Sequence, residues 1–399
     1  MNPKDPFPGK TLLLANIGSS SRRYAMFSSG RIVAGAHMER TGGEFKLTFS
    51  SLTEETRSIS PDEFSRGPVL FLDQLEAGAH FNPVTEVRAI GLRIVAPGTY
   101  FQENRIIDPW FLEALEKAEG VAPLHIASVL REIRILRERF PGIPMAGISD
   151  SAFHCTLPPS ARGYAIPFED AARLDLFRFG FHGISAQSAL RHLGDDSETL
   201  PRRIILCHLG GGASVTAIRD GKSIDTSMGF SPLEGLIMGS RIGDIDPGAV
   251  LYLQKHSGMD ADRLEEYFNA RCGLLGLSGI SPDIRELSNL EMEGDERARL
   301  ALESFVYRIR KYIGAYLAAL GGLDLLVFTG GIGEGSPLIR ARVCEEMEWI
   351  GLALDPSLNQ ASVAKDRAIQ APDSKIQVKI IHARELAEMA ALTESLLCR

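Results

Sequence analysis

Three consecutive glycines follow a short apolar run near the middle of the chain, and their spacing suggests a binding site for an oxyanion. Residues 204–207 (IILC) have the character of a buried strand, and His208 and the glycines at 210–212 come shortly after them. Glycine tolerates positive φ and lets a ligand approach the backbone closely, so such a bend exposes N–H groups that bind phosphate. Arg241 follows, with glycines close by on both sides. An arginine beside a phosphate cradle is what phosphoryl transfer requires.

Three further side chains stand where chemistry is possible, and each has a plainer alternative. Arg93 lies inside the apolar segment 87–95, where it must be paired or face a site, unless it extends from a strand end to solvent. Asp150 ends the predicted strand 145–150, a position common for metal ligands and also for turn or N-cap aspartates. His182 lies between an aromatic residue and a glycine, as a phosphate-facing donor or a packed core histidine.

A second glycine-rich bend follows another apolar segment. Residues 325–328 predict a buried strand, and the sequence TGGIGEGS at 329–336 leads into a helix predicted from Pro337. Because a glycine bend that opens a helix presents N–H groups to an anion, this segment predicts a second cradle, for phosphate or nucleotide.

The elements that must position these residues form two similar sets. Near the N-terminus a strand at 12–15, a Gly/Ser bend, a strand at 22–27, a Ser-Gly turn and a third strand follow one another. The segment 204–225 repeats this order, with Asp220-Gly221 as its hairpin turn. Two copies of one β-meander about half a chain apart predict an internally duplicated α/β protein, in which the first bend of each meander meets phosphate.

The composition is typical of a large cytoplasmic protein and argues against several other classes. The 399 residues, 44% of them hydrophobic, suffice for a large core and suggest two domains. With 43 basic and 51 acidic residues the formal net charge is −8, and no Lys/Arg run predicts binding to nucleic acid or to an anionic membrane. No apolar run has the length of a membrane span, and the Pro-rich start is unlike a signal peptide. The five cysteines have no metal-binding spacing, as expected of reduced cytoplasmic thiols.

Taken in order, the motifs resemble those of the acetate kinases, members of the acetate and sugar kinase/actin-like superfamily. The resemblance is collinear from Leu12 to the C-terminus. It rests on Glu385 and on seven segments: NIGSSS (16–21), APLH (122–125), DSAFHCTLP (150–158), FGFHGIS (179–185), the segment 208–247, GLLGLSGISPDIREL (273–287) and FTGGIGEGS (328–336).

The resemblance implies two actin-like (ribonuclease H-like) α/β domains with a cleft between them. The first would comprise residues 1–152 and 386–399, because the last helix would return to it, and the second, nucleotide-binding domain would comprise residues 153–385. A homodimer is also implied, with a reversible reaction that depends on Mg²⁺ or Mn²⁺. In that reaction the γ-phosphoryl group of ATP moves in line to the carboxylate of acetate, giving acetyl phosphate and ADP.

The resemblance also assigns roles to individual residues. The catalytic set would be Arg93, His125, Asp150, His182 and Arg241. Arg93 would hold the substrate carboxylate, whereas Arg241 and His182 would stabilise the phosphoryl group in flight. Asn16, Asp150 and Glu385 would organise the metal as hard oxygen ligands. The nucleotide and its phosphates would meet Ser19, Ser21, Arg23, His208, Gly210, Gly211, Gly212, Asp283, Arg285, Gly331, Ile332, Gly333 and Gly335.

The matching acyl pocket is small and apolar, which favours acetate over longer acids. Its residues would be Val95, Leu124, Phe181 and Pro232, together with the guanidinium of Arg93. A pocket of this kind discriminates one methylene by only about 10–200-fold. Propionate or another short-chain carboxylate therefore stays open as an alternative substrate.

The sequence departs from the family pattern at several motif positions. The replacements are Arg23 for lysine, Leu92, Ala96 and Ala186 for histidine, and Ile126, Gly211 and Gly335 for asparagine. Since losing one preorganised donor costs about 10²–10³ in rate, a weakened, nucleotide-binding regulatory homologue is a second alternative. The retained charged residues favour catalysis. A protein that only binds nucleotide has no physical reason to keep two arginines at the position of a transferring phosphoryl group.

Overall fold

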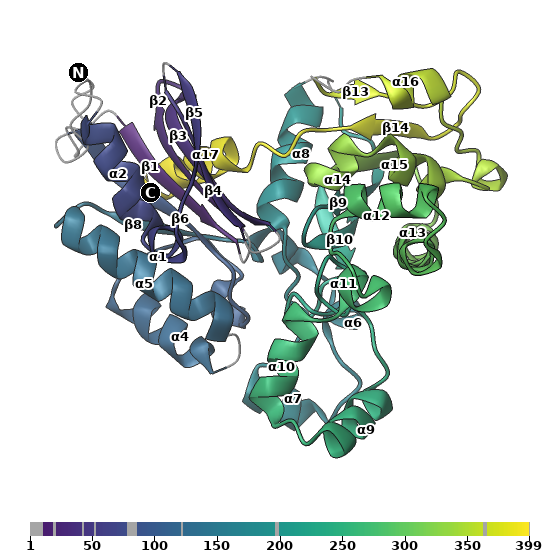
Figure 1. Ribbon diagram of the computed structural model, residues 1–399, viewed down its shortest axis with the longest axis horizontal. Helices are drawn as coiled ribbons and strands as arrows, with labels where there is room; N and C mark the ends of the chain where they lie inside the picture. Colours follow the sequence, from purple (N-terminus) through teal and green to yellow (C-terminus); the bar gives the residue numbers. More distant parts are fainter. Residues whose placement is uncertain are drawn as a thin grey trace. The chain divides into compact units, whose positions relative to one another are not determined.

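The computed structural model describes residues 11–18, 21–41, 44–51, 53–77, 86–120, 123–195, 199–361 and 365–398, without the side chains of 41 and 123–125. The chain divides into two compact units, Met1–Ala152 with Arg384–Arg399 and Phe153–Ala383. Each unit is built around its own sheet, with helices packed against it (Figure 1). The mixed α/β class predicted from the sequence is therefore correct. Residues 384 and 385 fall in the first unit, two residues beyond the predicted boundary.

The first unit holds a sheet in the order β5-β4-β3-β2-β1-β6-β8-β7. Its strands are β1 (Thr11–Ile17), β2 (Ser21–Ser28), β3 (Arg31–Thr41), β4 (Glu44–Ser50), β5 (Glu54–Ser58), β6 (Val87–Ile94), β7 (Arg105–Ile106) and β8 (Met145–Ser149). Its helices are α1 (Pro61–Ser65), α2 (Gly67–Ala77), α4 (Pro109–Glu119), α5 (Pro123–Arg139) and α17 (Glu385–Leu397). Figure 1 shows α17, the yellow C-terminal helix, beside β6 and β1, on which it packs together with β8.

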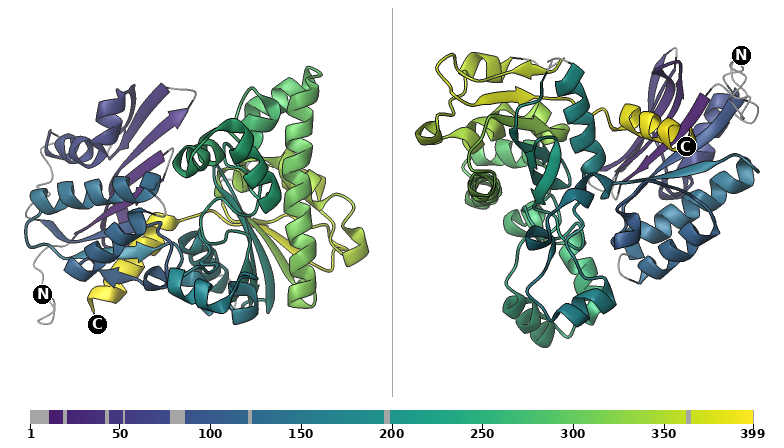
Figure 2. Two further views of the ribbon diagram at one scale, coloured as in Figure 1. Left: turned by 90° about the horizontal axis from the view of Figure 1, so that it is seen from below. Right: turned by 180° about the vertical axis from the view of Figure 1, so that it is seen from behind.

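The second unit holds a sheet in the order β11-β10-β9-β12-β14-β13. Its strands are β9 (Arg203–Leu209), β10 (Ala213–Arg219), β11 (Lys222–Thr226), β12 (Leu325–Thr329), β13 (Arg367–Ala368) and β14 (Gln377–Ile380). Its helices are α6 (Pro159–Arg162), α7 (Phe168–Leu174), α8 (Gly183–Asp195), α9 (Pro247–Ser257), α10 (Ala261–Ala270), α11 (Gly273–Ser278), α12 (Ile284–Met292), α13 (Glu296–Leu320), α14 (Gly330–Gly335), α15 (Pro337–Cys344) and α16 (Pro356–Gln360). Figure 2 shows the long green helix α13 running alongside the sheet, where it packs on β9 and β10.

The two sheets share one topology, which confirms the predicted duplication. In each, a first strand pairs antiparallel with the second and parallel with a later strand: β1 with β2 and β6, and β9 with β10 and β12. The hairpin turns also match, because Ser29-Gly30 has φ of 51° and 77° and Asp220-Gly221 has φ of 50° and 73°. Two consecutive positive φ values are the mark of a type I′ hairpin, the turn that Asp-Gly predicts.

Burial explains which elements the sequence revealed. Every residue of β1 and of β8 is buried, so both appear as continuous apolar runs. The edge strand β5 (EETRS) is exposed throughout and was not predicted, because exposed edge residues carry no apolar alternation. Its neighbour β4 (EFKLTFS) does alternate polar and apolar residues, but it was not predicted either. The long helix α13 begins at Glu296, because the Asp295 side chain accepts a hydrogen bond from Ala298 N and caps it.

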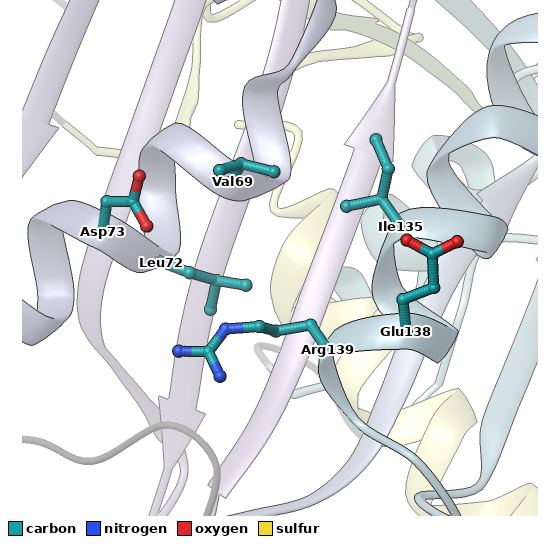
Figure 3. Close-up of a pocket in the computed structure, with 6 residues that line it drawn as sticks. All are labelled: Val69, Leu72, Asp73, Ile135, Glu138 and Arg139. Atoms are coloured by element: carbon teal, nitrogen blue, oxygen red, sulfur yellow. The ribbon is translucent and has the colours of Figure 1, made fainter.

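A cavity of about 220 Å³ lies between α2 and α5 of the first unit (Figure 3). Its lining residues are Val69, Leu72, Asp73, Ile135, Glu138 and Arg139. None of them was predicted as a site residue; Leu72 belongs to the buried core of the unit, and Val69 and Ile135 are half-buried. The cavity is thus a packing feature of the first unit.

A buried ion pair joins β2 to α5 inside the first unit. Arg22 Nη1 lies 3.2 Å from Glu132 Oε2, and the side chains are only 7% and 1% exposed. The guanidinium also stands over the Phe64 ring, 5.1 Å from its centroid. Burial raises the pKa of Glu132 from its ordinary 4.5 to about 7, although a hydrogen bond with Tyr24 and the charge of Arg22 oppose the rise. Burial therefore disfavours the ionised form of Glu132 more than the contacts with Tyr24 and Arg22 favour it.

This shift predicts a pH dependence of stability that Glu132→Gln should remove. Between pH 4.5 and 7 the folded chain holds a proton on Glu132 that the unfolded chain has lost, so the free energy of unfolding falls as pH rises through this window. We expect a loss of up to about 3 kcal/mol, with no further contribution above pH 7. Urea unfolding of both proteins across this range measures it. Parallel pH profiles for the wild type and the variant would contradict the expectation.

Candidate active site

Four predicted residues of the first unit form one hydrogen-bonded chain. Arg93, in β6, donates from Nη2 to Asp150 Oδ2 at 2.7 Å and from Nη1 to Asn16 Oδ1 at 3.1 Å. Asn16 Nδ2 in turn donates to Glu385 Oε2 at 2.6 Å. The fold explains the meeting: β1, β6 and β8 are parallel neighbours whose carboxyl ends share one sheet edge, and α17 begins at Glu385. Ligand sites of α/β proteins gather at such an edge.

The Arg93 guanidinium is the electrostatic centre of this group. Its side chain is 13% exposed and that of Asp150 is 1% exposed. Burial alone would lower the pKa of Arg93, but the charges of Asp150 and Glu385 outweigh it and raise the pKa well above the ordinary value. The arginine therefore stays cationic. The plain alternative, an arginine reaching from a strand end into solvent, is wrong.

The donor set of this group fits a hard divalent cation. An amide oxygen of Asn16 and the carboxylates of Asp150 and Glu385 are of the oxygen type that Mg²⁺ prefers, and they converge around one guanidinium. Within the described ranges, no group of three or more His, Cys, Asp or Glu side chains could hold a metal by itself. These residues would thus supply part of the coordination of Mg²⁺, the rest coming from phosphate oxygens and water.

The first Gly/Ser bend lies next to this group. Gly18 N donates to Ser21 O at 2.8 Å, which closes the turn between β1 and β2. Arg23 is exposed and pairs in register with Asn16 across the two strands. Three predicted residues lie outside the description: Ser19 entirely, and the side chains of Leu124 and His125.

In the second unit, two histidines lie beside the three-glycine bend. His182 and His208 have ring centroids 4.3 Å apart. Each ring is oriented by a serine through Nδ1, His182 by Ser214 Oγ at 3.0 Å and His208 by Ser185 Oγ at 2.8 Å. His182 has φ of 60°, an unusual value for a residue with a side chain, which directs the buried ring from the start of α8 toward the bend.

Arg241 joins the same bend. A Cβ placed on Gly212 would lie 3.2 Å from His182 Nε2 and 3.5 Å from Arg241 Nη1, so both side chains border this glycine. A Cβ placed on Gly210 would lie 4.0 Å from His208 Nε2 and 3.9 Å from Gly331 N. The structure thus brings Gly210, Gly212, His182, His208 and Arg241 together, as the sequence predicts, and adds the first residues of α14.

The loop that carries Arg241 is closed by two hydrogen bonds between Gly235 and Asp244. Asp244 Oδ1 accepts from Gly235 N at 2.9 Å, and Asp244 N donates to Gly235 O at 3.0 Å. Tyr312 OH donates to the same carboxylate at 2.9 Å. Gly273, with φ of 63°, packs directly on this loop, because a Cβ there would lie 2.6 Å from Arg241 O. The arginine is presented by a rigid loop.

The second glycine bend is itself a short helix. Residues 330–335 form α14 between β12 and α15, whereas the sequence predicted a helix only from Pro337. Glu334 Oε1 accepts from Gly330 N at 2.8 Å and from Ala383 N at 2.9 Å. That carboxylate therefore ties α14 to the end of β12 and to the segment after β14.

Two of the residues predicted to meet the nucleotide, Asp283 and Arg285, pair with each other. Asp283 caps α12 by accepting from Arg285 N at 2.8 Å, and Arg285 Nη2 donates to Asp283 Oδ2 at 2.6 Å. This hydrogen bond with Arg285 lowers the pKa of Asp283. Pro282 brings the segment to the glycine bend, because a Cβ on Gly239 would lie 3.4 Å from Pro282 and 3.6 Å from Gly211 O.

The residues predicted for the acyl pocket are divided between the units. Val95 is half-buried at the end of β6 in the first unit. Phe181 is 1% exposed and Pro232 is also buried, both in the second unit. The pocket they would form stays a prediction.

Two polar groups near the site were not predicted: Glu234, which is half-buried, and His154, which is buried. Glu234 accepts from Arg178 Nη2 at 2.5 Å and from Tyr164 OH, which leaves no room for a side chain at Gly229, where a Cβ would lie 1.6 Å from Glu234 Oε2. The His154 ring contacts Ser223 Oγ at 2.8 Å and Phe181 O at 3.0 Å. Glu234 (in SPLEG) and His154 (in DSAFHC) both lie in motifs that the sequence analysis quoted. Their roles could not be predicted, because their partners lie far away in the sequence.

Most of the departures from the family pattern lie in the core. Leu92, Ala96, Ile126 and Ala186 are completely buried. Apolar side chains at these positions need no hydrogen-bond partner, so the core accommodates them without an unsatisfied polar group. Gly335 is exposed, and a Cβ placed there would meet no heavy atom within 4 Å.

Comparison with known proteins identifies the class and then the family. The fold is that of an α/β kinase with two sheets. The Acetokinase family matches residues 11–391. The acetate kinase of Bacteroides thetaiotaomicron is 38% identical over 97% of this chain and 99% of its own. The crystal structure of Porphyromonas gingivalis acetate kinase superposes with a TM-score of 0.85 at 34% identity, covering 98% of this chain and 100% of the other. A propionate kinase from Francisella tularensis subsp. tularensis gives 0.88 at 32% identity, covering 97% and 100%.

The chain therefore belongs to the acetokinase family, as the sequence motifs predict. It covers nearly the full length of these relatives. No helix in the described part of the chain has both the length and the apolar character of a membrane span.

Proposed function

We propose that this protein transfers the γ-phosphoryl group of ATP to acetate, giving acetyl phosphate and ADP, and that Mg²⁺ assists. One observation supports this most strongly: His182 and Arg241 both border Gly212 in a three-glycine bend, where Ser214 orients the His182 ring and hydrogen bonds between Gly235 and Asp244 close the loop that carries Arg241. Two cationic or hydrogen-donating groups beside a glycine bend suit a transferring phosphoryl group.

The chemistry asks little of the protein beyond charge compensation. Acetate is already an anion at neutral pH, so no general base is needed. The obstacle is repulsion between this anion and the phosphates, which fixed donors and cations offset most effectively in a dry site. Arg93 would hold the acetate carboxylate, while Arg241 and His182 would stabilise the equatorial oxygens of the phosphoryl group. The transfer would be direct, with no covalent enzyme intermediate, and the same groups would serve the reverse transfer from acetyl phosphate to ADP.

The metal would be held by Asn16, Asp150 and Glu385, directly or through water. When bound, the metal would neutralise part of the charge of the nucleotide phosphates. Arg93 already holds Asn16 and Asp150 in place, which would preorganise these oxygens for the cation. ATP and ADP would lie against Gly331, Ile332 and the Asp283–Arg285 pair.

Trapping the product as a hydroxamate tests the proposal. Purified protein would receive Mg-ATP with acetate, propionate, butyrate or no acid, in the presence of hydroxylamine. Acetate-dependent hydroxamate that is absent from an Arg241→Ala control supports the kinase and ranks the acids. Nucleotide binding without product from any acid would contradict the kinase and leave a regulatory nucleotide-binding protein.

A second candidate substrate is propionate. The propionate kinase of Francisella is as similar in structure as the acetate kinase of Porphyromonas, and the predicted pocket residues other than Arg93 are all apolar. The ranking of kcat/KM between the two acids decides between them, since pockets of this kind discriminate by about 10–200-fold.

We also infer a homodimer in a reducing, cytoplasmic setting. All five cysteines are free thiols. No residue of α9 is buried, and its Leu251 and Tyr252 side chains are 65% and 67% exposed, which favours an apolar interface on the second unit.

The assembly can be tested on α9. Light scattering should report a dimer for the wild type, and Leu251→Glu should weaken it at least about tenfold because a charge would enter an apolar contact. Met292→Glu is the matched control, since Met292 is also exposed (78%) but lies on α12. A monomeric wild type, or equal dissociation of both variants, would refute the interface.

A further inference from the structure

Arg340 is a completely buried arginine whose partners are all neutral. It lies in α15 of the second unit with no exposed surface. Its Nε donates to Asn359 Oδ1 at 2.8 Å and Nη2 donates to Asn359 O at 2.8 Å. Its Nη1 donates to Gly333 O at 2.9 Å and to Glu334 O at 2.8 Å. The guanidinium is thus well hydrogen-bonded, but only to amide and carbonyl oxygens.

The charge of Arg340 has no counter-ion in the described part of the second unit. Arg178 and Arg203 in the same unit pair with Glu234 and Asp324, whereas no carboxylate of a described residue lies within ion-pair distance of Arg340. Burial therefore lowers the pKa of Arg340 to about 10, with a smaller repulsion from Arg367 and an opposing effect of Cys344. The side chain stays cationic at neutral pH. A buried cation without a counter-ion is costly, and such groups are expected where function uses the charge.

The position of this charge connects it to the second glycine bend. Gly333 O and Glu334 O are the carbonyls at the carboxyl end of α14, so Arg340 caps that helix where a cation is favourable. The other end of α14 lies at the three-glycine bend, because Gly331 N is 3.9 Å from a Cβ placed on Gly210. The Glu334 carboxylate is bonded to Gly330 N and Ala383 N, and no ion pair joins it to Arg340.

We propose that Arg340 is a positioning residue for the nucleotide, which holds α14 in place and keeps a positive charge beneath it that the nucleotide phosphates balance. The proposal rests on the proposed function for the location of the nucleotide. The ligand class is a nucleoside di- or triphosphate, and adenosine, which lacks phosphate, should not sense the charge. The measurable consequence is that a change in this charge should alter the Kd of a phosphorylated nucleotide more than the Kd of adenosine.

Asn359→Asp offers a sharp test because it places a carboxylate where Arg340 Nε now meets an amide oxygen. We expect the Kd of MgADP, measured by calorimetry, to rise about tenfold, while the Kd of adenosine changes less than twofold. Asn359→Ala is the matched control: it removes the side-chain bonds to Arg340 and Pro337 O without adding charge. Its ratio of the two Kd values should therefore stay near that of the wild type.

The outcomes separate this proposal from the proposed function. Equal weakening of MgADP and adenosine by Asn359→Asp would assign Arg340 a purely structural role and overturn the proposal, as would unchanged MgADP binding. A selective loss of MgADP affinity supports it even if the wild type forms no acyl phosphate, in which case only the kinase assignment fails. A wild type that binds neither ligand would overturn both. Arg340→Lys, which keeps the charge, should retain more of the MgADP preference than Asn359→Asp.

Discussion

Arg241→Ala should lower kcat for acetyl phosphate formation by about 10³-fold, with a much smaller change in the KM of either substrate. The reason is that the guanidinium would act on charge that develops as the phosphoryl group moves, and one preorganised donor of this type contributes about 10²–10³ in rate. The rigid loop closed by Asp244 would hold it at Gly212 before substrates bind. Initial rates of ATP-dependent hydroxamate formation measure the effect.

The control for this prediction is another arginine of the same unit. Arg299 lies on α13, 50% exposed and paired with Glu296 and Glu303, and Arg299→Ala should leave kcat within about twofold, because surface ion pairs contribute little. Arg241→Lys keeps the charge without the forked geometry and should fall between the two. An Arg241→Ala protein with near wild-type kcat would remove this residue from the catalytic set.

Arg93→Met should abolish detectable acetate phosphorylation and destabilise the first unit by about 3–5 kcal/mol. The side chain of Asp150 is 1% exposed, and removing its guanidinium partner leaves a buried carboxylate without that charge compensation. The same change takes a hydrogen bond from Asn16 Oδ1, so the predicted metal ligands lose their common anchor. Urea unfolding gives the stability effect, and hydroxamate trapping gives the activity.

A second substitution separates the two consequences of Arg93→Met. In the double variant Arg93→Met/Asp150→Asn the buried charge is gone, so most of the lost stability should return while activity stays absent. Recovery of both stability and activity in the double variant would contradict a direct role for Arg93 in the reaction. A single variant as stable as the wild type would contradict the assignment of a tightly coupled buried pair.

The sequence singled out Arg93 and Asp150 from the apolar runs that carry them, and the duplicated meander located the two bends. The contact between the two side chains was not predicted, because it depends on β6 and β8 being parallel neighbours in the sheet. The family resemblance added Asn16 and Glu385, which no local pattern could connect across 369 residues. The structure places them in one hydrogen-bonded chain.

Other features could not be predicted because they depend on contacts between distant segments. Glu234 is 70 residues from Tyr164, and only the packing between them explains why Gly229 must be glycine. Arg340 looks like an ordinary helix arginine in sequence, and its burial against Asn359 appears only in the fold. The exposed strand β5 has no apolar pattern to reveal it.

The most direct test of the account is to follow the phosphoryl group from ATP to acetate by ³¹P NMR, using acetate labelled with ¹⁸O in both carboxylate positions. If the acetate carboxylate attacks the γ-phosphorus directly, an acetyl phosphate signal should grow with ADP and carry the isotope shift of an ¹⁸O bridge. Formation of ADP without that signal, or acetyl phosphate whose phosphorus carries no ¹⁸O, would contradict direct transfer to the carboxylate.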